Sequence, residues 1–345
     1  MDKKKLITSL VFIIIVGAVI ISLTVSKKSY AVGNTLVDTV KALNKGSSWS
    51  AGASGVYYTN SHEYRYIGAE VKNYVKFNND LYRIIGVFDS NSHGVTGTEL
   101  VKLIRARSLG GYSWGAYNTD NSAGTYSGYA NDWTGKSKTS KANLNVLLNE
   151  YFYNKTDTSS TYGDCANWTY YYSNNSYKTK DCSDIITYGI DSSLRGYIET
   201  ATWYSYGSGT AQSKQNWYLC ERGGNSCTSS GPSTGDTSVT SKIGLMYLSD
   251  YLYASGYYAS TDTTTQDQYY FGNKNWLYKG WEWTLTPYAS GAGSVWSVYF
   301  GRADYYSSYY PLGSRPTFYL KSSVYVTGGN GSFDNPYTLG CDNCS

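Results

Sequence analysis

Between residues 64 and 104, the hydrophobic and polar positions form short runs with the spacing of β-strands. Residues 64–68 and 71–77 alternate between apolar and polar positions, and residues 81–88 form a β-branched apolar run that ends at a turn over 89–91. Residues 99–104 follow as the expected antiparallel partner of 81–88. This part of the chain is therefore predicted to form strands joined in hairpins.

Helical spacing replaces the strand pattern at two places. Ser140 can cap a helix with one apolar face, and Asp191 can cap a second one. The face of the first is Leu144, Leu147, Leu148, Tyr151 and Phe152, and that of the second is Leu194, Tyr197, Ile198 and Ala201.

More short strands are expected after residues 243–246, at residues 281–285, 294–300, 317–320 and 324–326. The segments between the two helices and over 204–240 are rich in small polar residues and are expected to be loop insertions. This order of elements predicts an α+β fold with one twisted antiparallel sheet, two helices and long loops.

The N-terminal segment is suited to a membrane. Residues 6–25 contain no charged residue and would span about 30 Å as a helix, the thickness of a bilayer core. The three lysines before it hold the N-terminal flank in the cytoplasm, so the rest of the chain is expected outside. The length favours an uncleaved single-pass anchor, whereas Ser29 and Ala31 offer a signal-peptidase site that would release a secreted protein. Both alternatives remain open.

Three regions follow from this pattern. Residues 1–31 are the signal or membrane anchor, and residues 32–55 are expected to be a helical stem and Gly/Ser linker, because apolar residues recur there at helical spacing. Residues 56–345 are expected to form one globular domain. The stem face consists of Leu36, Val37, Val40 and Leu43.

Composition and charge exclude some functions. Five lysines and one aspartate in the first 31 residues account for the whole formal charge of +4, so the remaining chain is neutral and lacks the basic stripe of a nucleic-acid-binding protein. The chain has 40 Tyr but only 8 Phe. Because tyrosine combines an apolar ring with a hydroxyl, this excess points to surfaces and grooves more than to a dry core.

The six cysteines lie in sequence-local pairs. In an exported protein such pairs favour disulfides over metal or redox chemistry, and each bond would close a polar loop. Six cysteines allow fifteen pairings, and proximity selects three of these bonds: Cys165–Cys182, Cys220–Cys227 and Cys341–Cys344.

Five segments together resemble a known family, namely residues 81–87, 243–251, 283–286, 295–298 and 313–320. The set is similar to exported, mostly uncharacterised Gram-positive bacterial proteins, over roughly residues 64–339. The C-terminal half of these proteins resembles the C-type-lectin-like fold shared with formylglycine-generating enzymes. The resemblance implies that fold and a binding module without a defined ligand. Residues 296–315 are similar to the C-terminal strips that retroelements diversify in some relatives, although Ser314 departs from the apolar residue usual before Arg-Pro.

The residues give little support to catalysis. Every cysteine has a local partner, so the reactive pair of formylglycine-generating enzymes is missing. His62 and His93 lie in turn-like segments and are expected to be solvated, and no G-x-S-x-G motif occurs. Asp262, Asp267 and Asp304 could contribute to a calcium site but are expected to be solvated turn residues. We expect neither an enzyme nor a bound cofactor or metal.

The most informative segment is residues 300–310, which is rich in Tyr, Ser, Gly, Arg and Asp, like the contact surface of an antibody. It is expected to be a loop held by strands at both ends, with at least one tyrosine of each adjacent pair exposed. The alternative is a Tyr-rich hairpin packed on its own sheet. The predicted ligand-binding residues are Arg302, Asp304, Tyr305, Tyr306, Tyr309 and Tyr310, with Trp276, Tyr278, Trp281 and Tyr288 as further aromatic contacts.

These features favour an adhesin-like or receptor-like module at the cell surface that binds an extracellular glycan or protein. The alternative is a structural subunit of a pilus-like fibre, with the apolar N-terminal helix packed in a filament core. The chain lacks a Gly-Phe-Thr-type processing site and a glutamate in that helix, which counts against this alternative.

Overall fold

The computed structural model describes residues 34–115, 133, 143–165, 169–173, 176–179, 182–224, 227, 237–260, 274–291 and 293–344. The expected membrane segment, the cleavage site after Ala31 and the proposed cap Ser140 lie outside these residues. Within them, no helix is both long and apolar enough to cross a membrane. The chain from Thr35 onward forms one compact unit.

The first sheet contains most of the N-terminal strands. Its strand order is β1-β2-β4-β5-β17, with β3 also paired to β4, and every pair is antiparallel. The expected hairpin between residues 81–88 and 99–104 is confirmed as β4 and β5. The strands are β1 (Gly55–Tyr58), β2 (Tyr64–Ile67), β3 (Tyr74–Phe77), β4 (Asp80–Phe88), β5 (Leu100–Arg105) and β17 (Thr317–Leu320).

A second sheet forms mainly from the C-terminal half, in the order β15-β14-β13-β16-β6. The prediction of a single antiparallel sheet is therefore wrong, and β13 and β16 even pair in parallel. The α+β class itself is confirmed. The strands are β6 (Gly111–Ser113), β13 (Glu282–Pro287), β14 (Ser294–Tyr299), β15 (Arg302–Ser307) and β16 (Pro311–Gly313).

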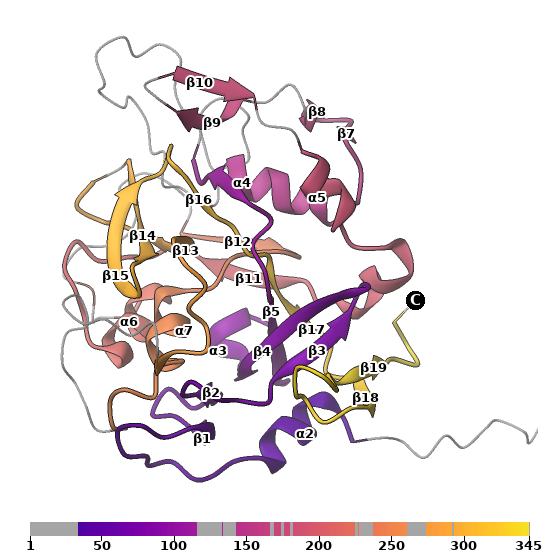
Figure 1. The fold of residues 1–345 in the computed structure, drawn as a ribbon, viewed down its shortest axis with the longest axis vertical. Helices are drawn as coiled ribbons and strands as arrows, with labels where there is room; N and C mark the ends of the chain where they lie inside the picture. The colour runs from indigo at the N-terminus through magenta and orange to yellow at the C-terminus, as the bar shows by residue number, and fades with distance from the viewer. Residues whose placement is uncertain are drawn as a thin grey trace, which may run out of the picture. The chain divides into compact units, whose positions relative to one another are not determined.

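Four two-stranded pairs complete the strands. Figure 1 shows the β9–β10 pair at one end of the unit and the β18–β19 pair near the other. The pairs are β7 (Thr158–Ser159) with β8 (Gly163–Asp164), β9 (Thr169–Ser173) with β10 (Ser176–Thr179), β11 (Ala201–Tyr204) with β12 (Ser238–Ser241), and β18 (Tyr325–Gly328) with β19 (Thr338–Gly340).

The helices are short. The first predicted helix is present as α4 and the π-helix η1, and all five residues of its predicted face are buried. The second is only a 3-10 turn, η3, because the chain leaves it to pair Ile198 with Leu320 of β17. The helices are α2 (Leu36–Ala42), α3 (Ser90–His93), α4 (Asn143–Val146), η1 (Leu147–Phe152), α5 (Ser183–Thr187), η3 (Ser192–Tyr197), α6 (Lys214–Glu221) and α7 (Leu248–Tyr253).

Two regions differ from the expected domain organisation. Helix α2, expected to be part of a separate stem, buries Leu36, Val37 and Val40 in the core, and the Leu36 amide donates to the Val324 carbonyl at 2.8 Å. The stretch 204–240, expected to be a loop insertion, contains α6, which buries Trp217 in the same core. Both segments therefore belong to the globular unit.

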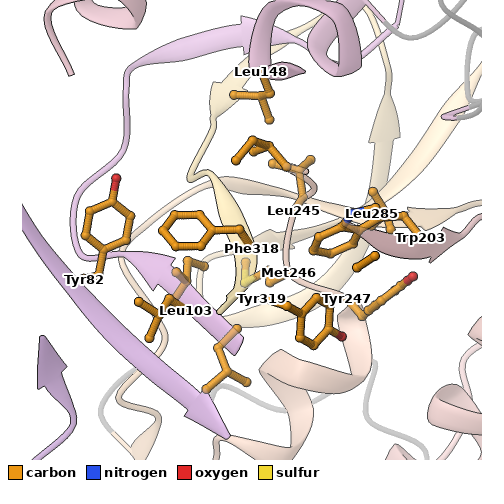
Figure 2. Close-up of a cluster of buried hydrophobic side chains, with 14 of the residues drawn as sticks. Tyr82, Leu103, Leu148, Trp203, Leu245, Met246, Tyr247, Leu285, Phe318 and Tyr319 are labelled. Carbon is orange, nitrogen blue, oxygen red and sulfur yellow. The ribbon is translucent and has the colours of Figure 1, made fainter. Parts of the chain in front are cut away.

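One hydrophobic core joins the two sheets. Figure 2 shows Phe318 of β17 gathered with Leu245 and with Leu285 of β13. The Phe318 ring lies 5.2 Å from that of Tyr82 and is fully buried. Because strands far apart in sequence meet here, the core fixes the position of the second sheet and of the hairpin at its edge.

A buried ion network lies beside this core. Asp250 of α7 accepts hydrogen bonds from Arg65 Nη1 at 2.8 Å and from Lys102 Nζ at 2.7 Å, and the side chains of all three are at most 1% exposed. Arg65 also donates to Glu63 at 2.8 Å. Burial lowers the pKa of Lys102 to about 8, although Asp250 opposes this shift. The network connects β2, β5 and α7.

The three predicted disulfides are present: Cys165–Cys182, Cys220–Cys227 and Cys341–Cys344. Cys220 lies on α6 and is fully buried, so this bond attaches the chain after α6 to the core.

Candidate functional site

Most of the Tyr-rich segment is a sheet strand in a hairpin with β14, which agrees with the alternative interpretation of a Tyr-rich hairpin and not with the expected loop. Phe300 and Gly301 have φ values of +47° and +83°, the pair of positive values that a tight two-residue hairpin turn requires. The turn brings β15 back along β14, where Trp296 pairs with Tyr305 and Ser297 with Asp304. Among the described strands, only β14 pairs with β15. Adjacent tyrosines of β15 therefore face opposite sides.

One face of the hairpin carries three aromatic rings. Tyr305 stacks on Tyr288 with a centroid distance of 4.0 Å and an interplanar angle of 9°. The Trp296 ring is nearly perpendicular to both rings, at centroid distances of 5.7 Å. Trp296 is buried. Its Nε1 donates to the Ser208 carbonyl at 2.8 Å, and its ring packs on Trp217. Tyr305, by contrast, is 47% exposed.

These rings line a hollow of about 460 Å³, which we call the Tyr305 hollow. Its other lining residues are Gly209, Thr210, Ala211, Arg302, Ala303 and Asp304. Arg302 Nη2 and Asp304 Oδ2 form an ion pair at 3.3 Å that is partly exposed to solvent. Such an exposed pair contributes little to stability and can exchange partners with a ligand. Burial and a hydrogen bond with Tyr305 raise the pKa of Tyr288, so this phenol keeps its proton at neutral pH.

The hollow thus combines flat apolar surface with hydrogen-bonding groups of both kinds. The Tyr288 phenol and the Arg302 guanidinium are donors, and the Asp304 carboxylate is an acceptor. An aromatic platform surrounded by such groups can bind a compound with an apolar ring face and polar substituents.

The other predicted tyrosines lie elsewhere. Tyr306 packs on Tyr310 at 4.9 Å and faces Tyr299 at 6.0 Å, on the opposite side of the hairpin from Tyr305. Tyr309 packs on Tyr310 at 4.6 Å, and all of these tyrosines except Tyr305 are half-buried. The expectation of an exposed member in each pair is therefore met by Tyr305 but only in part by Tyr309 and Tyr310.

The predicted tryptophans do not join the Tyr305 hollow. Trp276 is only 3% exposed, donates from Nε1 to the Tyr66 carbonyl at 2.7 Å, and lines a different hollow together with Tyr278. Trp281, which is 44% exposed, packs on Tyr299 at 4.5 Å. Of the predicted ligand-binding set, Arg302, Asp304, Tyr305 and Tyr288 are brought together.

The prediction for one histidine is wrong. His93 is fully buried at the end of α3, where Nε2 lies 3.0 Å from the Phe88 carbonyl oxygen and Nδ1 accepts from the Val95 amide. Burial lowers its pKa. His62 is exposed, as expected. His93 therefore has a structural role.

Sequence reasoning missed the floor of the hollow. Trp296 was expected in an apolar strand at the start of the strip 296–315 and not as a ligand contact. The loop 208–211 has nothing in its composition that distinguishes it from other polar loops. The alternation of Val295, Trp296, Ser297 and Val298 could have placed Trp296 on the Tyr305 face if the hairpin turn had been recognised.

No protein-family model, curated protein or solved structure matches the chain. In the described part of the chain, no group of three or more His, Cys, Asp or Glu side chains is arranged to hold a metal ion. Asp262 and Asp267 lie outside that part. The functional assignment therefore depends on the geometry of the hollow.

Proposed function

We propose that this chain is a binding module of the C-type-lectin-like kind, exported to the cell surface, that binds an extracellular glycan in the Tyr305 hollow. The exposed Tyr305 stacked on Tyr288 at a 460 Å³ hollow is the observation that supports this most. A sugar ring offers an apolar face to such a platform and hydroxyls to Arg302 and Asp304. The described residues suggest no catalytic constellation, so we propose binding without catalysis.

The glycan is favoured over a protein ligand because of the shape of the site. Small-molecule sites are concave, with few polar groups at fixed positions. The Tyr288, Tyr305 and Trp296 rings and the Arg302–Asp304 pair form such an arrangement. A protein epitope would require a larger contact surface that extends beyond the hollow.

Replacing Tyr305 with alanine should abolish most ligand binding with little loss of stability. Loss of an aromatic anchor costs about 2 kcal/mol of binding or more, about thirtyfold in affinity. Loss of its ring contacts should cost no more than about 1.5 kcal/mol of unfolding free energy. Full-length protein would be screened on a glycan array and a panel of surface proteins, and the variant then titrated with the best glycan.

Tyr257→Ala is the matched control, since Tyr257 is 43% exposed and lies outside the hollow. It should leave affinity unchanged. Equal affinity of the Tyr305 and Tyr257 variants would argue against the site. Binding to proteins alone would replace the glycan by a protein ligand, and fibre formation without either would favour the pilus-like alternative.

A further inference from the structure

A second hollow, of about 540 Å³, lies between β3, the start of β4 and the segment around Trp276. It shares no lining residue with the Tyr305 hollow. Both aromatic and charged side chains line it. The lining residues are Ala69, Glu70, Val71, Lys72, Tyr74, Arg83, Asn275, Trp276, Tyr278, Lys279, Ser332 and Phe333.

Arg83 lines this hollow as a buried cation with neutral partners. It is 4% exposed, and its guanidinium carbon lies 4.4 Å from the ring centroids of both Tyr74 and Trp276. Its donors reach Asn73 Oδ1 at 2.7 Å and the carbonyls of Trp276 at 2.9 Å and Val71 at 3.4 Å. All three acceptors are uncharged.

Other arginines with buried side chains differ from Arg83 in one respect. Each of them lies within 4 Å of a carboxylate: Arg65, Arg105, Arg222 and Arg315. A buried charge is costly unless an opposite charge compensates it. Consistent with this, burial lowers the pKa of Arg83 to about 10. Among the described residues, Arg83 is therefore a buried positive charge with no carboxylate in ion-pair distance, and Glu70 acts on it only through its longer-range charge.

The rim of the hollow adds to this positive charge. Lys72 and Lys279 line it and Glu70 is its one acidic lining residue, and within the described residues neither lysine forms an ion pair. Burial, followed by the charges of Arg83 and Arg315, lowers the pKa of Lys279. The potential at the rim thus disfavours a further cation and favours an anion.

We propose that this hollow binds a ring-bearing oxyanion, such as an acidic or phosphorylated sugar. Lys72 and Lys279 would neutralise the anionic group, with Arg83 supplying positive charge from the floor. Phe333, which is 58% exposed and packs its ring on Tyr74 at 5.4 Å, offers an apolar surface to the ring of the ligand. This site is independent of the Tyr305 hollow and of the function proposed for it.

The test is isothermal titration of full-length protein at low salt with galacturonic acid, glucose 6-phosphate and neutral glucose. At least one of the two anions should bind, glucose should not, and added salt should weaken binding. The exposed double variant Lys72→Gln/Lys279→Gln should lose about tenfold or more in affinity. Lys76→Gln is the matched control, because Lys76 is exposed on the same strand as Tyr74 but outside the hollow.

A second readout separates binding in the hollow from general attraction to lysines. The pKa of Lys279, followed by NMR of ¹³C-methylated lysines, should rise when the anion binds, whereas that of Lys76 should stay constant.

Binding by one anion alone identifies the anionic group as carboxylate or phosphate and supports the proposal. Three results would overturn it: no binding of either anion at millimolar concentration, equal binding of glucose, or equal affinity of the double variant and Lys76→Gln. Tyr305→Ala should leave this binding unchanged, which separates the two proposed sites.

Discussion

Asp250→Asn should lower the free energy of unfolding by about 3–5 kcal/mol, the usual cost of breaking a buried ion pair. The substitution keeps the size of the side chain but removes the negative charge that Lys102 and Arg65 share. Two cations would then be buried with less compensation. Denaturant titration of the full-length protein measures the loss. Asp334→Asn, at an exposed position, is the control and should change stability by about 0.5 kcal/mol or less.

The effect should depend on pH in a defined direction. Although burial opposes it, the charges of Lys102 and Arg65 hold the pKa of Asp250 well below its usual range. A carboxyl with a lowered pKa stabilises the fold above its unfolded-state pKa of about 4 and loses this contribution as the pH falls toward the folded-state value. The difference between wild type and Asp250→Asn should therefore shrink below about pH 4. A difference that stays constant into strong acid would contradict the role of the charge.

A double-mutant cycle with Lys102 tests the pair directly. Lys102→Met in the Asp250→Asn background removes the amine that would otherwise be left with less compensation, and Arg65 keeps its bond to Glu63. The double variant should therefore lose less stability than the sum of the two single variants. Additive losses would show that the two side chains do not interact.

The local parts of the fold were predictable from the sequence. The apolar run that became β4 and its partner β5 are close in the chain, so alternation and a short connection were sufficient to pair them. The same holds for the disulfides, because each joins cysteines that are near in sequence. A single sequence carries two kinds of information most directly: the spacing of its apolar residues, and which residues are near one another along the chain.

Long-range pairing could not be predicted. Strand β17 (Thr317–Leu320) pairs with β5 (Leu100–Arg105), and β16 pairs in parallel with β13, but no local signal selects these partners. They are selected by the shared core around Phe318 and Leu285. The same tertiary pairing shortens the helix expected after Asp191, since Ile198 pairs with Leu320.

Tyrosine composition was a poor guide to exposure. Tyr247 and Tyr251 are fully buried, and their hydroxyls donate to the carbonyls of Tyr204 and Gly301. A buried tyrosine hydroxyl needs a hydrogen-bond partner, and backbone carbonyls at the end of β11 and in the β14–β15 turn supply one to these two side chains. The excess of tyrosine therefore serves the interior as well as the surface.

The sequence indicated several residues of the candidate site but not how they are arranged. Residues 300–310 contain Arg302, Asp304 and Tyr305, which line the hollow. Because this segment is a strand, alternation places Tyr306 on the face opposite Tyr305, the face that Arg302 and Asp304 also share, so the hollow takes lining residues from both faces of this strand. The sequence also contains one weak indication of the buried charges. Arg83 and Lys102 interrupt apolar strands, where a charged residue is unexpected unless it has a partner or a function.

Phe318→Ala should cost about 3–5 kcal/mol of unfolding free energy, because it leaves a cavity in the core that joins both sheets. Phe318 is fully buried on β17, and its ring packs on those of Tyr82 at 5.2 Å and Phe77 at 5.5 Å. Phe77 lies on β3 and Tyr82 on β4, so both neighbours are held by strands of the first sheet. Denaturant titration measures the loss for the full-length protein.

Two further variants separate a cavity from a general effect of removing a phenyl ring. Phe333→Ala makes the same change at a position that is 58% exposed, and it should cost about 0.5 kcal/mol or less. Phe318→Leu fills more of the space than alanine and should recover more than half of the loss, since the cost of a cavity grows with its volume. Similar losses for the two alanine variants, or no recovery with leucine, would mean that Phe318 does not occupy a tightly packed core position. In that case the packing of the Phe318 ring on Phe77 and Tyr82 would contribute little to the stability of the first sheet.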